Sequence, residues 1–150
     1  MICCEVRDTP IGKVNIGADG ENVLWLCFGD AEATEANKIT AEAFRQLEEY
    51  FAGKRKIFGL PLKLEGTPFQ VKVWEALRQI PYGSTISYGE LADMAGCPNG
   101  ARAVGGAMRE NRIPVFIPCH RVITSEGKLG GYSGGLDVKR KLLQLEGVSL

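Results

Sequence analysis

The sequence lacks the features that mark most metal, membrane and secreted proteins. It has one histidine and five cysteines, with no CxxC and no histidine pair, so we expect no metal site and no cofactor. An odd number of cysteines argues against a disulfide framework and favours a reducing compartment. No apolar run approaches ~18 residues and no signal peptide opens the chain. We therefore expect a cytoplasmic protein with no membrane partner.

The chain also has no net charge, because 18 Lys and Arg residues balance 18 Asp and Glu residues. Its two halves nevertheless differ in net charge. Residues 1–66 carry 8 basic and 11 acidic side chains, a balance of −3, whereas residues 67–150 carry 10 and 7, a balance of +3. The mildly basic C-terminal half could face phosphates. No Walker-type phosphate loop is present, so nucleotide hydrolysis has no support.

The pattern of the first part predicts a small α/β domain over residues 1–60. Three β-prone stretches with turns between them, residues 1–6, 13–17 and 22–28, predict an antiparallel sheet. Residues 39–53 have helical periodicity, with Thr40 as the expected N-cap and Gly53 as the stop. A linker is expected over residues 61–66, which makes the whole chain α+β.

A mainly helical domain is predicted over residues 67–150. Its helices are expected at residues 67–80, 87–96, 100–111 and 136–147. Ser87 and Glu90 have capping-box spacing at the start of the second. The turn of residues 96–99 gives the second and third helices helix-turn-helix proportions.

Cys119 and His120, in FIPCHRVI, suggest nucleophilic chemistry. A thiol is mostly protonated at neutral pH, and an imidazole can remove its proton directly or through a water. Pro118 fixes the backbone before the thiol. Glu146 could orient the imidazole, although an anion at the end of a helix opposes the helix dipole. The alternative is a buried structural cysteine beside a surface histidine and a solvated glutamate.

Other polar or small residues have two interpretations each. The small residues of 100–107 indicate close approach of the helix either to a ligand or to another helix, and glycine there costs about 1 kcal/mol relative to alanine. Arg102 could reach a duplex or lie in solvent. Tyr88 and Tyr132 could be half-buried loop anchors, and Asn111 a turn residue. The remaining cysteines are expected to serve packing, with Cys97 exposed in its turn.

From about Thr67 to Gly147 the chain resembles the O6-alkylguanine-DNA alkyltransferases. The resemblance rests on TPFQVKVWEALRQIPYGSTISYGELA, ARAVGGAMREN, IPCHRV, GGYSGGLDVK and LLQLEG, in that order. It implies that Cys119 takes an alkyl group from O6 of a damaged guanine, once per molecule. His120 would act as its base through a water, and Glu146 would hold the imidazole. It also implies that Tyr88 donates toward the guanine and that Asn111 pins the turn before the cysteine.

The resemblance further implies a monomer that binds double-stranded DNA containing O6-alkylguanine in the minor groove. The guanine would be flipped out of the duplex, and Arg102 would fill its place. Small residues would let the helix enter a groove about 6 Å wide. The residues expected at the DNA are Ser87, Tyr88, Ala101, Arg102, Gly105 and Met108, and those of the substrate pocket are Val122, Tyr132, Ser133 and Gly134.

Two other functions fit parts of the sequence. A non-catalytic helix-turn-helix sensor of alkylated DNA would need no thiol, and the alkyltransferase-like proteins of that kind lack the cysteine that is present here at position 119. A cysteine hydrolase could use Cys119, His120 and Glu146, but it would give the helix-turn-helix segment no task.

Overall fold

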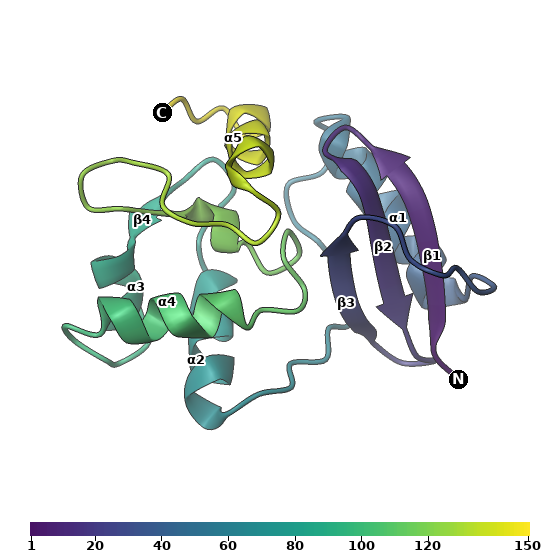
Figure 1. Cartoon of the computed structure of the whole chain (residues 1–150), viewed down its shortest axis with the longest axis horizontal. Helices are drawn as coiled ribbons and strands as arrows, with labels where there is room; N and C mark the ends of the chain where they lie inside the picture. Colours follow the sequence, from purple (N-terminus) through teal and green to yellow (C-terminus); the bar gives the residue numbers. More distant parts are fainter. The chain divides into compact units, whose positions relative to one another are not determined.

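The computed structural model describes all residues, 1–150, and they form two compact units, Met1–Lys63 and Leu64–Leu150 (Figure 1). No helix in either is both long and apolar enough to cross a membrane.

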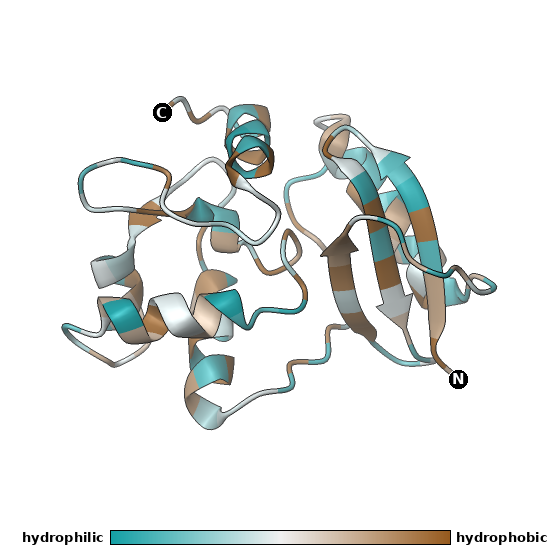
Figure 2. Cartoon of the chain, in the orientation of Figure 1, coloured by the Kyte–Doolittle hydropathy of each residue, from teal (hydrophilic) through white to brown (hydrophobic).

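The N-terminal unit is a three-stranded antiparallel sheet with one helix packed against it. Strands β1 (Cys3–Thr9), β2 (Gly12–Ala18) and β3 (Val23–Phe28) lie in sequence order, and helix α1 (Lys38–Phe51) contacts all three. Figure 2 shows β3 apolar along most of its length, whereas β1 alternates, as expected for a strand with one solvated face. The predicted sheet and helix are confirmed. The core of this unit contains Val14, Ile16, Leu26, Phe44, Leu47 and Tyr50.

The start of α1 differs from the sequence-based expectation. Asn37, not Thr40, is the N-cap, and its side chain accepts a hydrogen bond from the Thr40 backbone N–H at 2.8 Å. The Thr40 hydroxyl in turn accepts one from the Asn37 N–H at 3.0 Å, which completes a capping box. Both residue types can cap a helix, and the Asn37 amide also donates to the Ala18 carbonyl, which fixes the helix start against the sheet.

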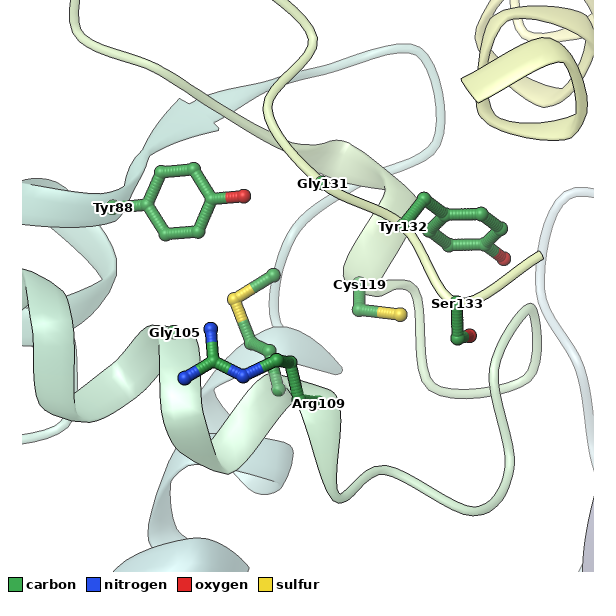
Figure 3. A pocket seen from close by; sticks show the side chains of 8 residues that line it. Tyr88, Gly105, Arg109, Cys119, Gly131, Tyr132 and Ser133 are labelled. Carbon is green, nitrogen blue, oxygen red and sulfur yellow. The ribbon is translucent and has the colours of Figure 1, made fainter. Parts of the chain in front are cut away.

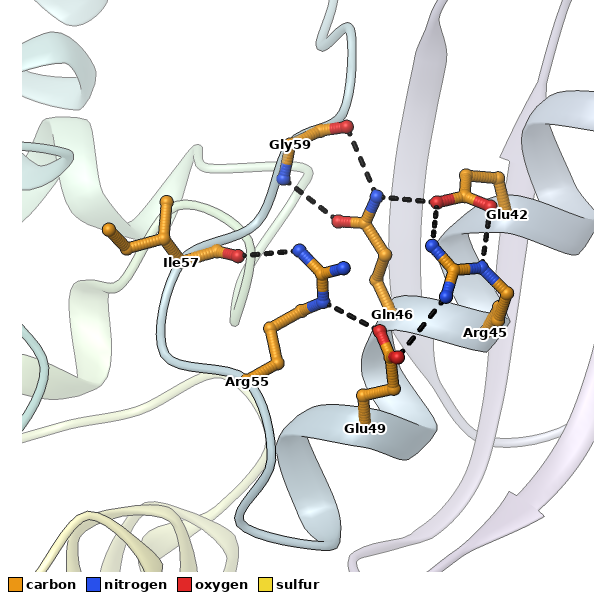
Figure 4. Close-up of polar contacts among 7 residues, drawn as sticks. All are labelled: Glu42, Arg45, Gln46, Glu49, Arg55, Ile57 and Gly59. Atoms are coloured by element: carbon orange, nitrogen blue, oxygen red, sulfur yellow. Dashed lines mark hydrogen bonds and ion pairs between the residues drawn. The ribbon is translucent and has the colours of Figure 1, made fainter.

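A side-chain network holds the chain after α1 against that helix (Figure 4). The amide of Gln46 accepts from the backbone N–H of Gly59 at 2.8 Å and donates to its carbonyl at 3.1 Å. Arg55 donates to Glu49 and to the carbonyl of Ile57. Gln46 is only 4% exposed, so these bonds satisfy a buried side-chain amide.

The C-terminal unit is mainly helical, as predicted. Helix α2 (Pro68–Leu77) starts at Thr67 and α3 (Tyr88–Met94) at Ser87, each with a capping box. Helix α4 (Ala101–Arg109) follows α3 after a short turn and packs on both α2 and α3. The chain ends after α5 (Leu136–Leu145). The indole N–H of Trp74 donates to the Ala107 carbonyl at 2.8 Å, which ties α2 to α4 inside the core.

A short parallel pair joins distant parts of this unit. Strand β4 (Ile86–Ser87) immediately precedes α3, and β5 (Val122–Ile123) immediately follows the 3₁₀ turn η1 (Cys119–Arg121). Ile86 pairs with Val122 and Ser87 with Ile123. The pair therefore sets the start of α3 beside the Cys119 segment.

Several details depart from the sequence prediction. The helices expected at residues 67–80, 100–111 and 136–147 end earlier, at Leu77, Arg109 and Leu145. Of the remaining cysteines, Cys3 and Cys4 are buried, but Cys27 is exposed and Cys97 only half-buried. Cys27 lies on β3, where alternate side chains face away from the core, so its expected packing role is wrong.

Replacing Gln46 by alanine should lower the free energy of unfolding by about 1–3 kcal/mol, because two part-buried hydrogen bonds to the Gly59 backbone are lost. Urea denaturation measures this loss. Gln144→Ala, an exposed glutamine on α5, is the matched control and should change stability by less than about 0.5 kcal/mol. Equal effects of the two substitutions would contradict a pinning role for Gln46.

Candidate active site

Cys119 stands at a tight bend of the backbone. The Cys119 N–H donates to the Ile117 carbonyl at 2.8 Å across Pro118, whose φ of −80° and ψ of 63° are those of an inverse γ-turn. The turn η1 then carries Cys119, His120 and Arg121, all buried. Proline favours this bend because its ring fixes φ near the required value.

Asn111 organises the loop before the cysteine. Its side-chain oxygen accepts from the Ile113 N–H at 2.9 Å, and its amide donates to the Ile117 carbonyl at 3.3 Å and to Cys119 Sγ at 3.5 Å. Val115, between these contacts, has a φ of 75°, which strains a β-branched residue. The Asn111 bonds help to hold this strained loop closed, and one of them reaches the sulfur directly.

Tyr88 follows β4 and its ring lies against the glycine-rich loop. A Cβ added at Gly130 would lie 2.7 Å from the Tyr88 hydroxyl oxygen, so only glycine permits this approach. Burial raises the pKa of the Tyr88 phenol, more than the backbone hydrogen bond from Gly131 lowers it. The phenol is thus a hydrogen-bond donor at neutral pH.

Cys119 opens into a pocket of about 390 Å³ (Figure 3). Figure 3 shows Tyr88 on one side of the Cys119 sulfur and Tyr132 and Ser133 on the other, with the Arg109 side chain extending from α4 on the Tyr88 side. Arg109 is the only charged side chain in the lining. The complete lining is Tyr88, Gly105, Met108, Arg109, Cys119, Gly131, Tyr132 and Ser133.

The thiol of Cys119 is held protonated at rest. Burial raises its pKa to about 11, although the hydrogen bond from Asn111 and the charge of Lys139 both act to lower it. These two groups favour the thiolate without producing it at neutral pH. They are therefore placed to stabilise negative charge only when it develops on the sulfur.

His120 and Glu146 form a buried pair beside the thiol. Nε2 of His120 lies 2.7 Å from Oε2 of Glu146, and both side chains are 0% exposed. Burial lowers the pKa of His120 more than its bond to Glu146 raises it, so the imidazole is neutral near pH 7. A neutral ring that donates from Nε2 carries its lone pair on Nδ1, and no protein group bonds to that atom.

Lys139 on α5 is fully buried, at 0% exposed, whereas its neighbour Val138 is only half-buried. Its ammonium donates to the carbonyls of Val122 at 2.7 Å, Gly131 at 3.2 Å and Leu129. Desolvation lowers the pKa of Lys139 to about 8. Lys139 thus ties β5 and the part of the glycine-rich loop just before Tyr132 to the last helix.

The structure brings most of the predicted site residues together. Cys119, His120, Glu146 and Asn111 form one buried group, and Tyr88, Gly105, Met108, Tyr132 and Ser133 line the pocket. Val122 and Gly134 are not in the pocket lining, and Val122 directs its carbonyl to Lys139. Ala101 and Arg102 are exposed on α4, and Ser87 caps α3.

Sequence reasoning missed Arg109, Arg121 and Lys139. Nothing in a single sequence separates these arginines and this lysine from the solvated majority of their kind. No group of three or more His, Cys, Asp or Glu side chains is arranged to hold a metal ion.

Comparison with known proteins assigns both units to one family. Residues 68–148 match the model of the 6-O-methylguanine DNA methyltransferase DNA-binding domain, and residues 2–64 match that of the ribonuclease-like domain of the same proteins. The chain belongs to the O6-methylguanine DNA methyltransferase family. The resemblance inferred from the sequence is confirmed.

Close relatives of this family cover nearly the whole chain. A methylated-DNA–protein-cysteine methyltransferase of Mycobacterium bovis is 56% identical over 97% of this chain and 93% of its own length. One from Methanosarcina acetivorans is 45% identical over 95% and 96%.

Solved structures of the family superpose on this fold. The Mycobacterium tuberculosis OGT in complex with DNA has a TM-score of 0.89 and 44% identity, covering 95% of this chain and 91% of that one. The S. pombe Atl1 bound to damaged DNA containing O6-carboxymethylguanine matches less of the chain, 57% against 82% of its own, with a TM-score of 0.51 and 38% identity.

The raised pKa of Cys119 predicts slow reaction with iodoacetamide at neutral pH. In the native protein the rate at Cys119 should climb with pH toward about 11, whereas in urea it should level off near the ordinary value of 9.0. Peptide-resolved mass spectrometry over a pH series separates Cys119 from the other cysteines. A native midpoint at or below that of the unfolded chain would contradict the role of burial.

Proposed function

We propose that this protein is an intracellular DNA-repair methyltransferase that removes the alkyl group from O6-alkylguanine in duplex DNA and keeps it on Cys119. The observation that carries the proposal is the thiol of Cys119 at a 390 Å³ pocket, with the buried His120–Glu146 pair beside it. Family membership supplies the substrate class, since its members are named for methylated DNA and a protein cysteine.

The proposed reaction is a single displacement at carbon. The Cys119 proton passes through a water to Nδ1 of His120, and the sulfur attacks the alkyl carbon. An S–C bond forms as the C–O6 bond breaks, and the electron pair moves onto the guanine. The phenol of Tyr88 donates a hydrogen bond to the ring and makes the base a better leaving group. The thioether product is stable, so each molecule acts once.

The surface of α4 supports binding in the minor groove. Ala101, Arg102 and Ala103 are exposed, and a Cβ at Gly105 would meet nothing closer than 4.0 Å outside its own helix backbone. No other helix therefore requires this glycine, which favours the ligand interpretation of the small residues. A guanine inside a duplex is out of reach, so it must be flipped into the pocket, and Arg102 would occupy the space it leaves.

A non-catalytic sensor is the second candidate, since the Atl1 neighbour binds damaged DNA. The surroundings of the Cys119 thiol argue against a sensor. Asn111 donates a hydrogen bond to the sulfur and His120 is the next residue in the chain, and a non-catalytic sensor would need neither arrangement. A cysteine hydrolase would release its product over many turnovers. The methyl-transfer experiment below distinguishes it from a protein that keeps the alkyl group.

Mixing the protein with a duplex containing one O6-methylguanine should add a single methyl group to the peptide that holds Cys119. Intact-protein and peptide mass spectrometry measure the gain. Cys119→Ser should show none, and Cys27→Ser, an exposed thiol of the other unit, should react as the native protein does. Binding of the damaged duplex without any methyl gain would favour the sensor, and repeated turnover the hydrolase.

Arg102→Ala should slow transfer from the duplex by about tenfold or more, because filling the vacated position offsets a flipping cost of a few kcal/mol. Transfer from a single strand carrying the same base should change little. Rapid-quench kinetics on both substrates tests this, with the exposed Arg140→Ala as the matched control. An equal loss on both substrates would contradict a role in base flipping.

A further inference from the structure

Arg121 is a buried cation, only 6% exposed, that follows Cys119 and His120 in the turn η1. Its Nε and Nη2 donate to the two carboxylate oxygens of Glu146, at 2.9 and 3.0 Å. Its Nη1 donates to the carbonyl of Ile80 at 2.7 Å. This fork geometry fixes the carboxylate in one orientation and is specific to arginine.

Glu146 needs this partner for two physical reasons. Its side chain is 0% exposed, and it caps the C-terminus of α5, where the helix dipole opposes a negative charge. The backbone N–H of Gly83 at 3.1 Å and Nε2 of His120 at 2.7 Å are its other hydrogen-bond partners. Of these groups, Arg121 alone supplies a full positive charge at neutral pH. The Glu146–Arg121 pair is therefore neutral as a unit.

The charge around His120 follows from that pairing. Glu146 and Lys139 face it from α5, Arg121 and the protonated Cys119 belong to its own turn, and the Tyr132 ring lies edge-on at 6.5 Å. One anion and two cations thus surround the imidazole. A neutral ring is favoured in these surroundings, with the proton on Nε2 toward Glu146 and the lone pair on Nδ1.

We infer that Arg121 is a positioning residue for alkyl transfer: it neutralises Glu146 and so keeps His120 a neutral imidazole whose Nδ1 accepts the Cys119 proton. The transfer part rests on the proposed function. The charge state of His120 can be measured without any substrate, so the two ideas fail separately.

The pH dependence has a definite sign. Burial is the main cause that lowers the pKa of His120, Arg121 and Lys139 lower it further, and Glu146 raises it. Without Arg121, the uncompensated carboxylate would favour the imidazolium, which cannot accept a proton. Transfer by the native protein should therefore stay constant down to below pH 6.5, whereas transfer by an Arg121 variant should begin to fall at a higher pH.

The single histidine makes the test direct, because all imidazole signals of the full chain come from His120. NMR titration of the native protein should give a pKa below the ordinary 6.5, and Arg121→Met should raise that pKa. Arg121→Lys keeps the charge but loses the fork and should give a value between the two. Arg140→Met, an exposed arginine on α5, is the matched control and should match the native protein.

Removing both charges separates electrostatics from damage to the fold. In Arg121→Met/Glu146→Gln no uncompensated carboxylate remains, so the His120 pKa should fall again from its value in Arg121→Met. Between pH 8 and pH 6, transfer by Arg121→Met should slow several-fold more than transfer by the native protein. An unchanged His120 pKa in Arg121→Met, or in the second neutral variant Arg121→Gln where the methionine variant does not fold, overturns the inference. A native protein that titrates as expected but transfers no methyl group overturns only the proposed function.

Discussion

The buried carboxylate of Glu146 is the constraint on which the C-terminal unit depends. A charge without water must find its partners inside the protein, and leaving it unpaired costs about 3–5 kcal/mol. Its hydrogen-bond partners come from two segments distant from α5 in sequence: the turn after α2, through Gly83, and the 3₁₀ turn η1, through His120 and Arg121. Satisfying one carboxylate therefore fixes the position of the residues that flank the thiol.

A second buried charge completes the arrangement from the other side. The ammonium of Lys139 joins the carbonyl of Val122 in β5 to that of Gly131 in the glycine-rich loop, and Glu146 caps the same helix. Helix α5 thus organises the histidine with one side chain and the pocket loop with another. Both polar contacts are shielded from water, which strengthens them and makes each one costly to lose.

The Cys119 thiol is unreactive at rest, yet two groups in its surroundings already favour the thiolate. Burial keeps Cys119 protonated, while Asn111 already donates to the sulfur and the charge of Lys139 favours the thiolate. A protonated thiol resists oxidation and stray alkylation. For a protein that we propose acts only once, protection before the substrate arrives matters as much as reactivity afterwards.

Local signals in the sequence determined much of this protein. Turn residues and alternation predicted the sheet, Thr67 and Ser87 marked two helix starts, and the cysteine and histidine of IPCHRV identified the site, because each depends on neighbours a few residues apart. The cap of α1 was wrong because Asn37 and Thr40 both suit the position, and contact with the sheet selects between them. Only the tertiary structure revealed Arg109, Arg121 and Lys139 in the site. A charged side chain is buried when its partners lie there, and those of Arg121 and Lys139 come from segments that meet only in the folded chain.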